Sequence, residues 1–97
     1  MFGKRIMFYE CKDFLMTNCV RLKPIVEIDS NTYLKIKFTN GKRNLFITLH
    51  KGRGVVIVDI TDDYYMLRIP QEEFKNVEKY QSYMLEMLKK VDSIFNG

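Results

Sequence analysis

The chain has 97 residues, of which 46% are hydrophobic and 29% are charged, and its formal net charge at pH 7 is +4. This length supports one folded domain with a core of its own, so residues 1–97 are expected to form a single unit. The composition argues against an intrinsically disordered chain. No apolar run approaches the roughly 18–20 residues of a membrane span, and the first twenty residues lack a signal-peptide pattern. We therefore expect an intracellular protein that has no membrane partner.

The positive charge lies in the first two thirds of the chain. Residues 1–69 contain 12 Lys or Arg and 7 Asp or Glu, whereas residues 70–97 contain 4 and 5. Within residues 21–53, eight basic residues stand against only Glu27 and Asp29. Such a field favours polyanions such as nucleic acids. The alternative is a solvated sheet face whose lysines only keep the protein soluble.

Two further features of the composition bear on origin and on redox state. The chain has no alanine and is rich in Lys, Ile, Asn, Phe and Tyr, whose codons are AT-rich. This bias indicates an AT-rich genome such as that of a virus, which would place the protein in the cytoplasm of a host cell. Cys11 and Cys19 are too few for a disulfide scaffold and have no metal-site spacing, so we expect buried free thiols.

The first 24 residues allow two interpretations. The run from Arg5 to Tyr9 is typical of the start of a strand, whereas Glu10 to Val20 is compatible with a short helix whose apolar residues include Phe14 and Leu15. Pro24 disfavours helical geometry at the residue before it, so a strand is expected to begin there and to run over 25–29. Polar turn residues follow at 29–31.

A hairpin over Tyr33–His50 is the clearest element of the sequence, because Asn40-Gly41 separates two alternating runs. Both residues of such a turn adopt positive φ, which Asn and Gly tolerate. A two-residue loop sets this pairing: Thr39 with Lys42, Lys37 with Asn44, Ile36 with Leu45, Lys35 with Phe46, Leu34 with Ile47, and Tyr33 with Thr48. The aliphatic residues of both strands then share one face, and the basic and aromatic residues share the other.

The rest of the chain predicts two more strands and a helix. The β-branched run 55–60 suits a central strand, Asp62-Asp63 makes a turn, and 64–69 forms a last strand. After Pro70 the apolar period changes to about three and a half, which predicts an amphipathic helix over 70–95. The fold class is therefore α+β, an antiparallel meander of four to five strands over 25–69 followed by one long helix.

The apolar stripe of this helix is wide for a single neighbour. We expect its second half to form a homodimer interface, although packing wholly on its own sheet and on the amino-terminal segment is the alternative. The residues of the predicted interface are Met84, Met87, Leu88, Val91 and Phe95.

The sequence offers little for catalysis. His50 is the single histidine and has no nucleophile or carboxylate at triad spacing. Asp59, Asp62 and Asp63 lack calcium-loop spacing, and Gly52-Arg53-Gly54 lacks the pattern of a phosphate loop. We therefore expect no enzyme activity, no metal and no cofactor.

The outer face of the predicted sheet carries aromatic and basic residues together. Rings that stack on bases and cations that neutralise phosphate are what single-stranded nucleic acid requires. Val55 and Ile57 also face outward in this alternation, so the competing interpretation is a second core surface beneath the amino-terminal segment. The candidate nucleic-acid-binding residues are Tyr33, Lys35, Lys37, Lys42, Arg43, Phe46, His50, Lys51, Arg53, Tyr64 and Arg68.

The stretch Leu67-Arg68-Ile69-Pro70-Gln71-Glu72-Glu73-Phe74, which leads into the long helix, resembles the positive-cofactor-four (transcriptional coactivator) family. It is also similar to small single-stranded-DNA-binding proteins of archaeal viruses. The resemblance implies a curved antiparallel sheet, dimers formed through the terminal helix, and nucleic acid held by the sheets.

Together these features predict a homodimeric, non-enzymatic protein that binds single-stranded DNA or RNA. A viral module that binds or inhibits a host protein is the alternative, because Tyr and Arg also dominate protein interfaces. A small nuclease is a third possibility, and it needs a metal or a base that the sequence does not indicate.

Overall fold

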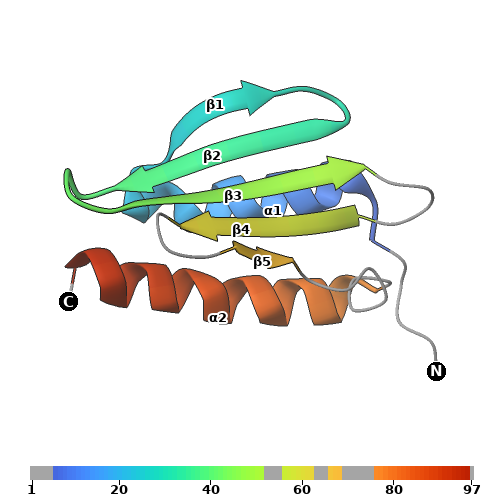
Figure 1. Ribbon diagram of the computed structural model, residues 1–97. Coiled ribbons are helices and arrows are strands. Elements are labelled where there is room, and N and C mark those ends of the chain that lie inside the picture. Colours follow the sequence, from blue (N-terminus) through green and yellow to red (C-terminus); the bar gives the residue numbers. More distant parts are fainter. Residues whose placement is uncertain (1–5, 52–55, 63–65, 69–75, 97) are drawn as a thin grey trace.

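Figure 1 shows the computed structural model, which describes residues 6–51, 56–62, 66–68 and 76–96. The described elements, in chain order, are helix α1 (Phe8–Cys19), the 3-10 helix η1 (Val20–Leu22), strands β1 (Ile25–Asp29), β2 (Tyr33–Thr39), β3 (Asn44–Lys51), β4 (Val56–Asp62) and β5 (Met66–Arg68), and helix α2 (Val77–Asn96).

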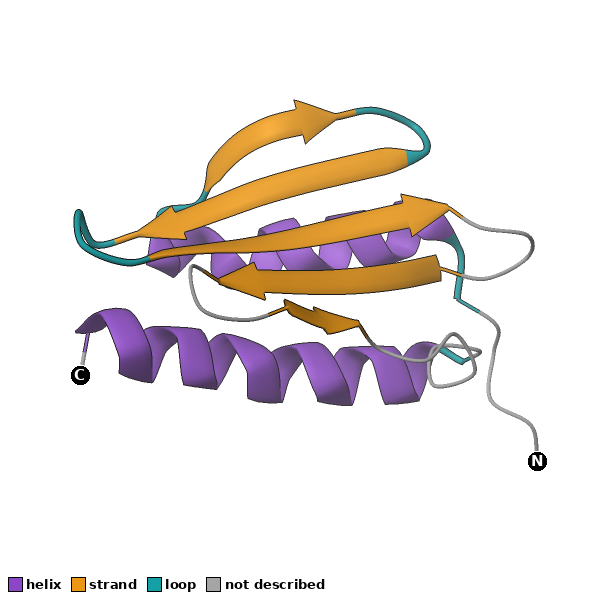
Figure 2. Cartoon of the chain, viewed as in Figure 1, coloured by secondary structure: helices purple, strands orange, loops and turns teal. Residues whose placement is uncertain are grey.

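The five strands form one antiparallel sheet in the order β1-β2-β3-β4-β5. Each strand pairs with its neighbour in sequence, as expected for a meander. In the view of Figure 2, α1 lies behind the strands and α2 runs below β5. The predicted α+β class, with an antiparallel meander followed by a carboxy-terminal helix, is confirmed.

The register of the central hairpin differs from the prediction by two residues. The structure pairs Thr39 with Asn44, Lys37 with Phe46 and Lys35 with Thr48. The turn therefore spans four residues, 40–43, instead of two. Because the shift is even, every side chain stays on the face that the sequence predicted.

The side chain of Asn40 explains the longer turn. Its Oδ1 accepts the backbone N–H groups of Lys42 at 2.9 Å and Arg43 at 2.8 Å. This arrangement is typical of an Asx turn, and it requires positive φ only at Gly41, where φ is 89°. The Asn-Gly pair thus located the turn correctly, but the two-residue geometry assigned to it was wrong.

One core lies between the sheet and both helices. Six buried side chains of the central hairpin contribute to it: Leu34, Ile36, Phe38, Leu45, Ile47 and Leu49. Helix α1 adds Phe8, Cys11, Leu15 and Cys19, and helix α2 adds Tyr80, Met84, Leu88 and Val91. Both helices therefore cover the same face of the sheet.

The amino-terminal segment adopts the helical alternative. The buried residues of α1 recur at the spacing of one helical face, and Glu10 Oε1 accepts the backbone N–H of Met7 at 3.2 Å, just before the first turn. The predicted strand over 5–9 is wrong at its described end, because Phe8 and Tyr9 belong to the helix. The chain then turns at Lys23, whose backbone is left-handed, and enters β1 after Pro24.

Helix α2 begins at Val77 and not at the predicted Pro70. Asn76 Oδ1 accepts the backbone N–H of Lys79 at 2.8 Å, which is the hydrogen bond of an N-cap. The part of the predicted helix at 70–75 lies outside the described residues.

The predicted dimer interface needs a correction. Met84, Leu88 and Val91 are buried in the core of the single chain, and Met87 and Phe95 pack against that core. The alternative, in which the stripe packs on its own sheet and on the amino-terminal segment, describes the structure. The stripe was wide because it contacts both α1 and the sheet. A homodimer through another surface stays a prediction.

The junction of the two helices contains three buried ionisable groups. Tyr80 donates its hydroxyl hydrogen to the Cys11 carbonyl oxygen at 2.9 Å, and its ring meets that of Phe14 edge-on. Burial raises the pKa of the Cys11 thiol to about 12 and that of Cys19 to about 11, and it raises the pKa of Tyr80 well above 10. The predicted buried free thiols are confirmed.

These raised pKa values predict that the protein loses stability in alkali. Above pH 9.0, the ordinary pKa of a cysteine, the unfolded chain releases thiol protons that the folded chain still holds. Each thiol then lowers the free energy of unfolding by up to about 1.4 kcal/mol per pH unit, whereas below pH 9 its contribution is constant. Urea denaturation between pH 7 and pH 11 measures this loss. In a Cys19→Ala variant the free energy of unfolding should decline less steeply with pH than in the wild type. Equal declines in the two proteins would contradict the raised pKa of the Cys19 thiol.

Candidate nucleic-acid interface

The candidate site is the face of the sheet that points away from the helices, here called the outer face. Register and alternation place three rows of described residues on it: Tyr33 with His50; Lys35 with Thr48 and Asp59; and Lys37 with Phe46 and Thr61. The sequence left open that the amino-terminal segment covers this face. Helix α1 packs on the core face instead, so it does not cover the outer face.

Two lysines flank one aromatic ring near the middle of this face. The Lys35 ammonium nitrogen lies 4.8 Å from the centroid of the Phe46 ring, and that of Lys37 lies 6.0 Å from it. All three side chains are half-buried, so the ring remains partly open to solvent. Cation–π attraction of this kind contributes about 0.5–1 kcal/mol at exposed sites and holds the charges beside the ring. The arrangement offers a stacking surface with cations at its margin.

A second group lies at the other end of β2. The Tyr33 ring meets the His50 ring edge-on with centroids 4.7 Å apart, and His50 Nε2 lies 3.2 Å from Asp59 Oδ2. The Asp59 carboxylate is nearly buried and faces the imidazole. The structure thus gives His50 a carboxylate neighbour on β4, although the spacing along the sequence showed none.

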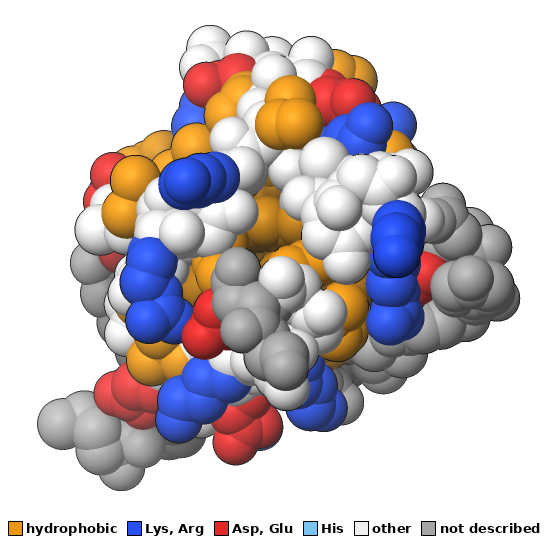
Figure 3. Space-filling view, turned by 90° about the vertical axis from the view of Figure 1, so that its left-hand side faces the viewer, with side chains coloured by type: hydrophobic (Ala, Val, Ile, Leu, Met, Phe, Trp, Pro, Cys, Tyr) orange, Lys and Arg blue, Asp and Glu red, His pale blue; other side chains and the backbone are white. Residues whose placement is uncertain are grey.

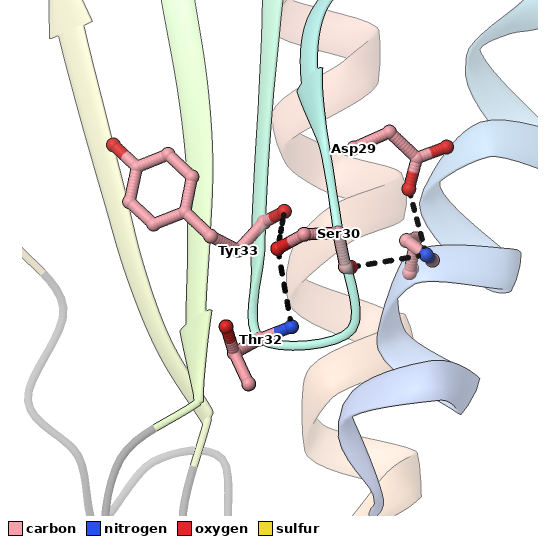
Figure 4. A network of polar contacts seen from close by, with 5 residues as sticks. Asp29, Ser30, Thr32 and Tyr33 are labelled. Atoms are coloured by element: carbon pink, nitrogen blue, oxygen red, sulfur yellow. Dashed lines mark hydrogen bonds and ion pairs between the residues drawn. The ribbon is translucent and has the colours of Figure 1, made fainter.

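The β1–β2 turn holds the backbone of Tyr33 through hydrogen bonds. Figure 4 shows that Ser30 accepts the backbone N–H of Thr32 and donates to the Tyr33 carbonyl oxygen. Asp29 Oδ1 accepts a hydrogen bond from the Lys12 ammonium nitrogen at 2.7 Å, which connects this turn to α1. The ring of Tyr33 points away from α1 in this view. The turn therefore binds the backbone of β2, and the Tyr33 ring lies on the outer face.

Two of the predicted phosphate ligands have carboxylate partners. Lys35 Nζ lies 3.7 Å from Glu27 Oε1, and Arg43 donates from Nε to the buried carboxylate of Asp62 at 2.8 Å, with a second, shorter contact from Nη2. The Arg43 assignment is corrected, because its guanidinium joins the β2–β3 turn to the end of β4. Among the described residues no carboxylate pairs with Lys37, Lys42 or Lys51.

The remaining predicted site residues are only partly placed. Arg53 and Tyr64 lie outside the described residues. The backbone of Arg68 pairs with Asp59, which puts its register position on the row of Lys35 and Thr48.

Sequence reasoning missed the acidic side of this face. Asp59 follows Val55 and Ile57 in the outward alternation, so its position was visible in the sequence, but its nearness to His50 depended on the register. Glu27 was counted in the charge balance, but its nearness to Lys35 was not predicted, because a bulge between Val26 and Ile28 interrupts the pairing of β1.

Within the parts of the chain that the structure describes, no group of three or more His, Cys, Asp or Glu side chains lies close enough to hold a metal ion. The described helices include none that is long and apolar enough to cross a membrane. Comparisons with protein-family models, with curated proteins and with solved structures found no match to this chain. The resemblance to the positive-cofactor-four family therefore stays a prediction.

Proposed function

We propose that the protein binds single-stranded nucleic acid on the outer face of its sheet. The observation that carries this proposal is the position of α1. Both helices serve the core face, so Phe46, Tyr33 and the lysines beside them remain partly accessible on the opposite face.

Three described lysines of the hairpin and its end, Lys37, Lys42 and Lys51, have no carboxylate partner among the described residues. Lys37 lies beside Phe46 on the outer face and Lys42 lies in the β2–β3 turn, whereas Lys51 ends β3 on the alternation of the core face and is not counted as an outer-face cation. At about 3.3 Å per residue, β3 extends over roughly 23 Å, which suits a short single-stranded site of about four nucleotides. In the proposal Lys37 and Lys42 neutralise phosphates while Phe46 and Tyr33 stack on bases.

A single strand fits this face better than a duplex does. Rings lying on a sheet can stack only on bases that are not already paired and stacked. A duplex reader usually inserts a helix into the major groove. Helix α2 offers no excess of positive charge for that role, because it contains three acidic and three basic residues.

The proposal predicts salt-sensitive binding of single strands. Fluorescence anisotropy of a labelled strand of about thirty nucleotides is measured over a salt series, with a duplex of equal length beside it. If Lys37 and Lys42 each neutralise one phosphate, the slope of log K against log salt is about −1.4, and the single strand binds at least about tenfold more tightly than the duplex. No binding at low salt, or preference for the duplex, would refute the proposal.

The edge strand β1 favours a second candidate, binding to a partner protein such as a host factor. Ile25, Val26 and Ile28 are each nearly half exposed, and one edge of β1 is unpaired in the described sheet. Such an edge can accept a strand from another chain. Co-purification of a partner that Ile28→Lys abolishes, in a preparation free of nucleic acid, would favour this candidate.

A further inference from the structure

The surface is hollowed at the end of the sheet where β2 meets the β2–β3 turn. Figure 3 shows this end of the molecule, with hydrophobic side chains in the hollow and Lys and Arg side chains around it. A cavity of about 250 Å³ lies here. Its apolar side is formed by Leu22, Phe38 and Phe95, which come from η1, β2 and α2. Thr39, at the end of β2, is the one lining residue that follows the outward alternation, and no residue of the three outer-face rows lines the cavity.

The mouth of the cavity carries positive charge. Lys23 and Arg21 line it and are exposed, and Arg21 Nη2 contacts Asp92 Oδ2 at 2.8 Å. In the described part of the structure, no carboxylate pairs with Lys23. Lys23 is therefore the cation that remains for a ligand.

The backbone at Lys23 has a conformation that lysine rarely adopts. Its φ and ψ are 54° and 60°, and its N–H donates to the Val20 carbonyl oxygen at 3.1 Å. Left-handed geometry costs a residue with a side chain roughly 1–2 kcal/mol, and such residues often lie at functional sites. The fold thus holds a lysine at the mouth of this cavity in a place where glycine would be less strained.

Asn40, which also lines the cavity, adds a hydrogen-bond donor. Its Oδ1 is occupied by the N–H groups of Lys42 and Arg43. The side-chain amide has a second polar atom, Nδ2, which can donate two hydrogen bonds. Within the described residues no acceptor takes them, so the cavity combines an apolar wall with a cation and an amide donor.

We propose that this cavity binds a nucleoside monophosphate, either free in solution or as the phosphorylated terminal nucleotide of a strand. The flat base lies against Phe95 and Leu22, the phosphate binds Lys23, and the Asn40 amide donates to a carbonyl or ring nitrogen of the base. The volume is below the roughly 300–1,000 Å³ of pockets for drug-sized ligands, which limits the ligand to one nucleotide. This site is separate from the outer face.

The test follows backbone amide signals in NMR spectra during titration with uridine monophosphate. The expected result is saturable shifts at Lys23, Leu22 and Asn40, with uridine alone and inorganic phosphate each binding at least about tenfold more weakly, because each makes only part of the contacts. Competition by strands with and without a terminal phosphate then distinguishes the two sources of the nucleotide.

Two variants and one control sharpen the test. Asn40→Asp keeps an oxygen acceptor for the turn but places negative charge at the mouth, and Lys23→Gln removes the cation. Each is expected to weaken binding at least about fivefold. Lys79→Gln removes an exposed cation at the opposite end of α2 and leaves the affinity unchanged.

Three results would overturn the inference: no shifts up to about 10 mM nucleotide, shifts confined to Phe46 and His50, or equal affinity in Asn40→Asp. Failure of the outer-face proposal gives a different pattern, because the long strand would then fail to bind while the mononucleotide still binds.

Discussion

Replacing Tyr80 with alanine is expected to lower the free energy of unfolding by about 3–5 kcal/mol, the range for removing a large aromatic side chain from a core. Tyr80 is fully buried between α1 and α2, and its ring packs edge-on against Phe14. The substitution leaves a cavity at the junction of the two helices and removes the hydroxyl hydrogen bond to the Cys11 carbonyl. The total free energy of unfolding of a domain of this size is about 5–15 kcal/mol, so the variant loses a large part of its stability. Urea denaturation followed by circular dichroism measures the change.

Two further variants separate the contributions of Tyr80. Tyr80→Phe removes only the hydroxyl and should cost about 0.5–1.5 kcal/mol. Tyr9→Ala is the matched control, because Tyr9 lies on α1 but is 67% exposed, and it should cost less than about 0.5 kcal/mol. Equal losses in Tyr9→Ala and Tyr80→Ala would contradict the position of Tyr80 in the core.

Replacing Phe46 with alanine is expected to weaken binding of a single strand by about fivefold to more than a hundredfold, which corresponds to the 1–3 kcal/mol of one stacked base. Phe46 lies at the centre of the outer face, with Lys35 and Lys37 beside its ring. The variant also loses the ring that keeps both ammonium groups in place. Anisotropy at a fixed low salt concentration measures the loss.

The controls for Phe46 distinguish stacking from charge. Phe46→Tyr keeps an aromatic ring and should bind as the wild type does, whereas Phe46→Leu keeps apolar volume and should lose affinity. Lys37→Gln should reduce the salt slope by about 0.7, the value for one phosphate contact, and Lys79→Gln on α2 should leave the slope unchanged. If Phe46→Leu and Phe46→Tyr bind equally well, base stacking on Phe46 is refuted.

The two faces of the sheet were predictable from the sequence, but the register of the hairpin was not. Alternation in β2 and β3 separates Leu34 and Ile36 from Lys35 and Lys37 whatever the turn geometry, because only an odd shift exchanges the faces. The pairing itself depended on the side chain of Asn40, which makes a four-residue turn with two hydrogen bonds to following N–H groups.

The packing of the helices was harder to predict. The buried residues of α1, among them Cys11 and Cys19, are spaced as one helical face, but these cysteines were treated as thiols and not as part of an apolar stripe. Without α1 on the core face, the stripe of α2 had too many apolar residues for one sheet, and Met84 and Leu88 were assigned to a dimer. The contacts of Arg43 with Asp62 and of His50 with Asp59 join β4 to the β2–β3 turn and to β3, so no local sequence pattern predicted them.

The most direct test of the central claim is to locate a bound base on the protein. A short strand containing 5-iodouracil is irradiated in complex with the protein, and the crosslinked residue is identified by mass spectrometry. Binding on the outer face predicts crosslinks at Phe46 or Tyr33, and their loss in Phe46→Ala or in a competition with unlabelled strand. Crosslinks found only in α1, or only at residues of α2 other than Phe95 of the cavity, would contradict the account.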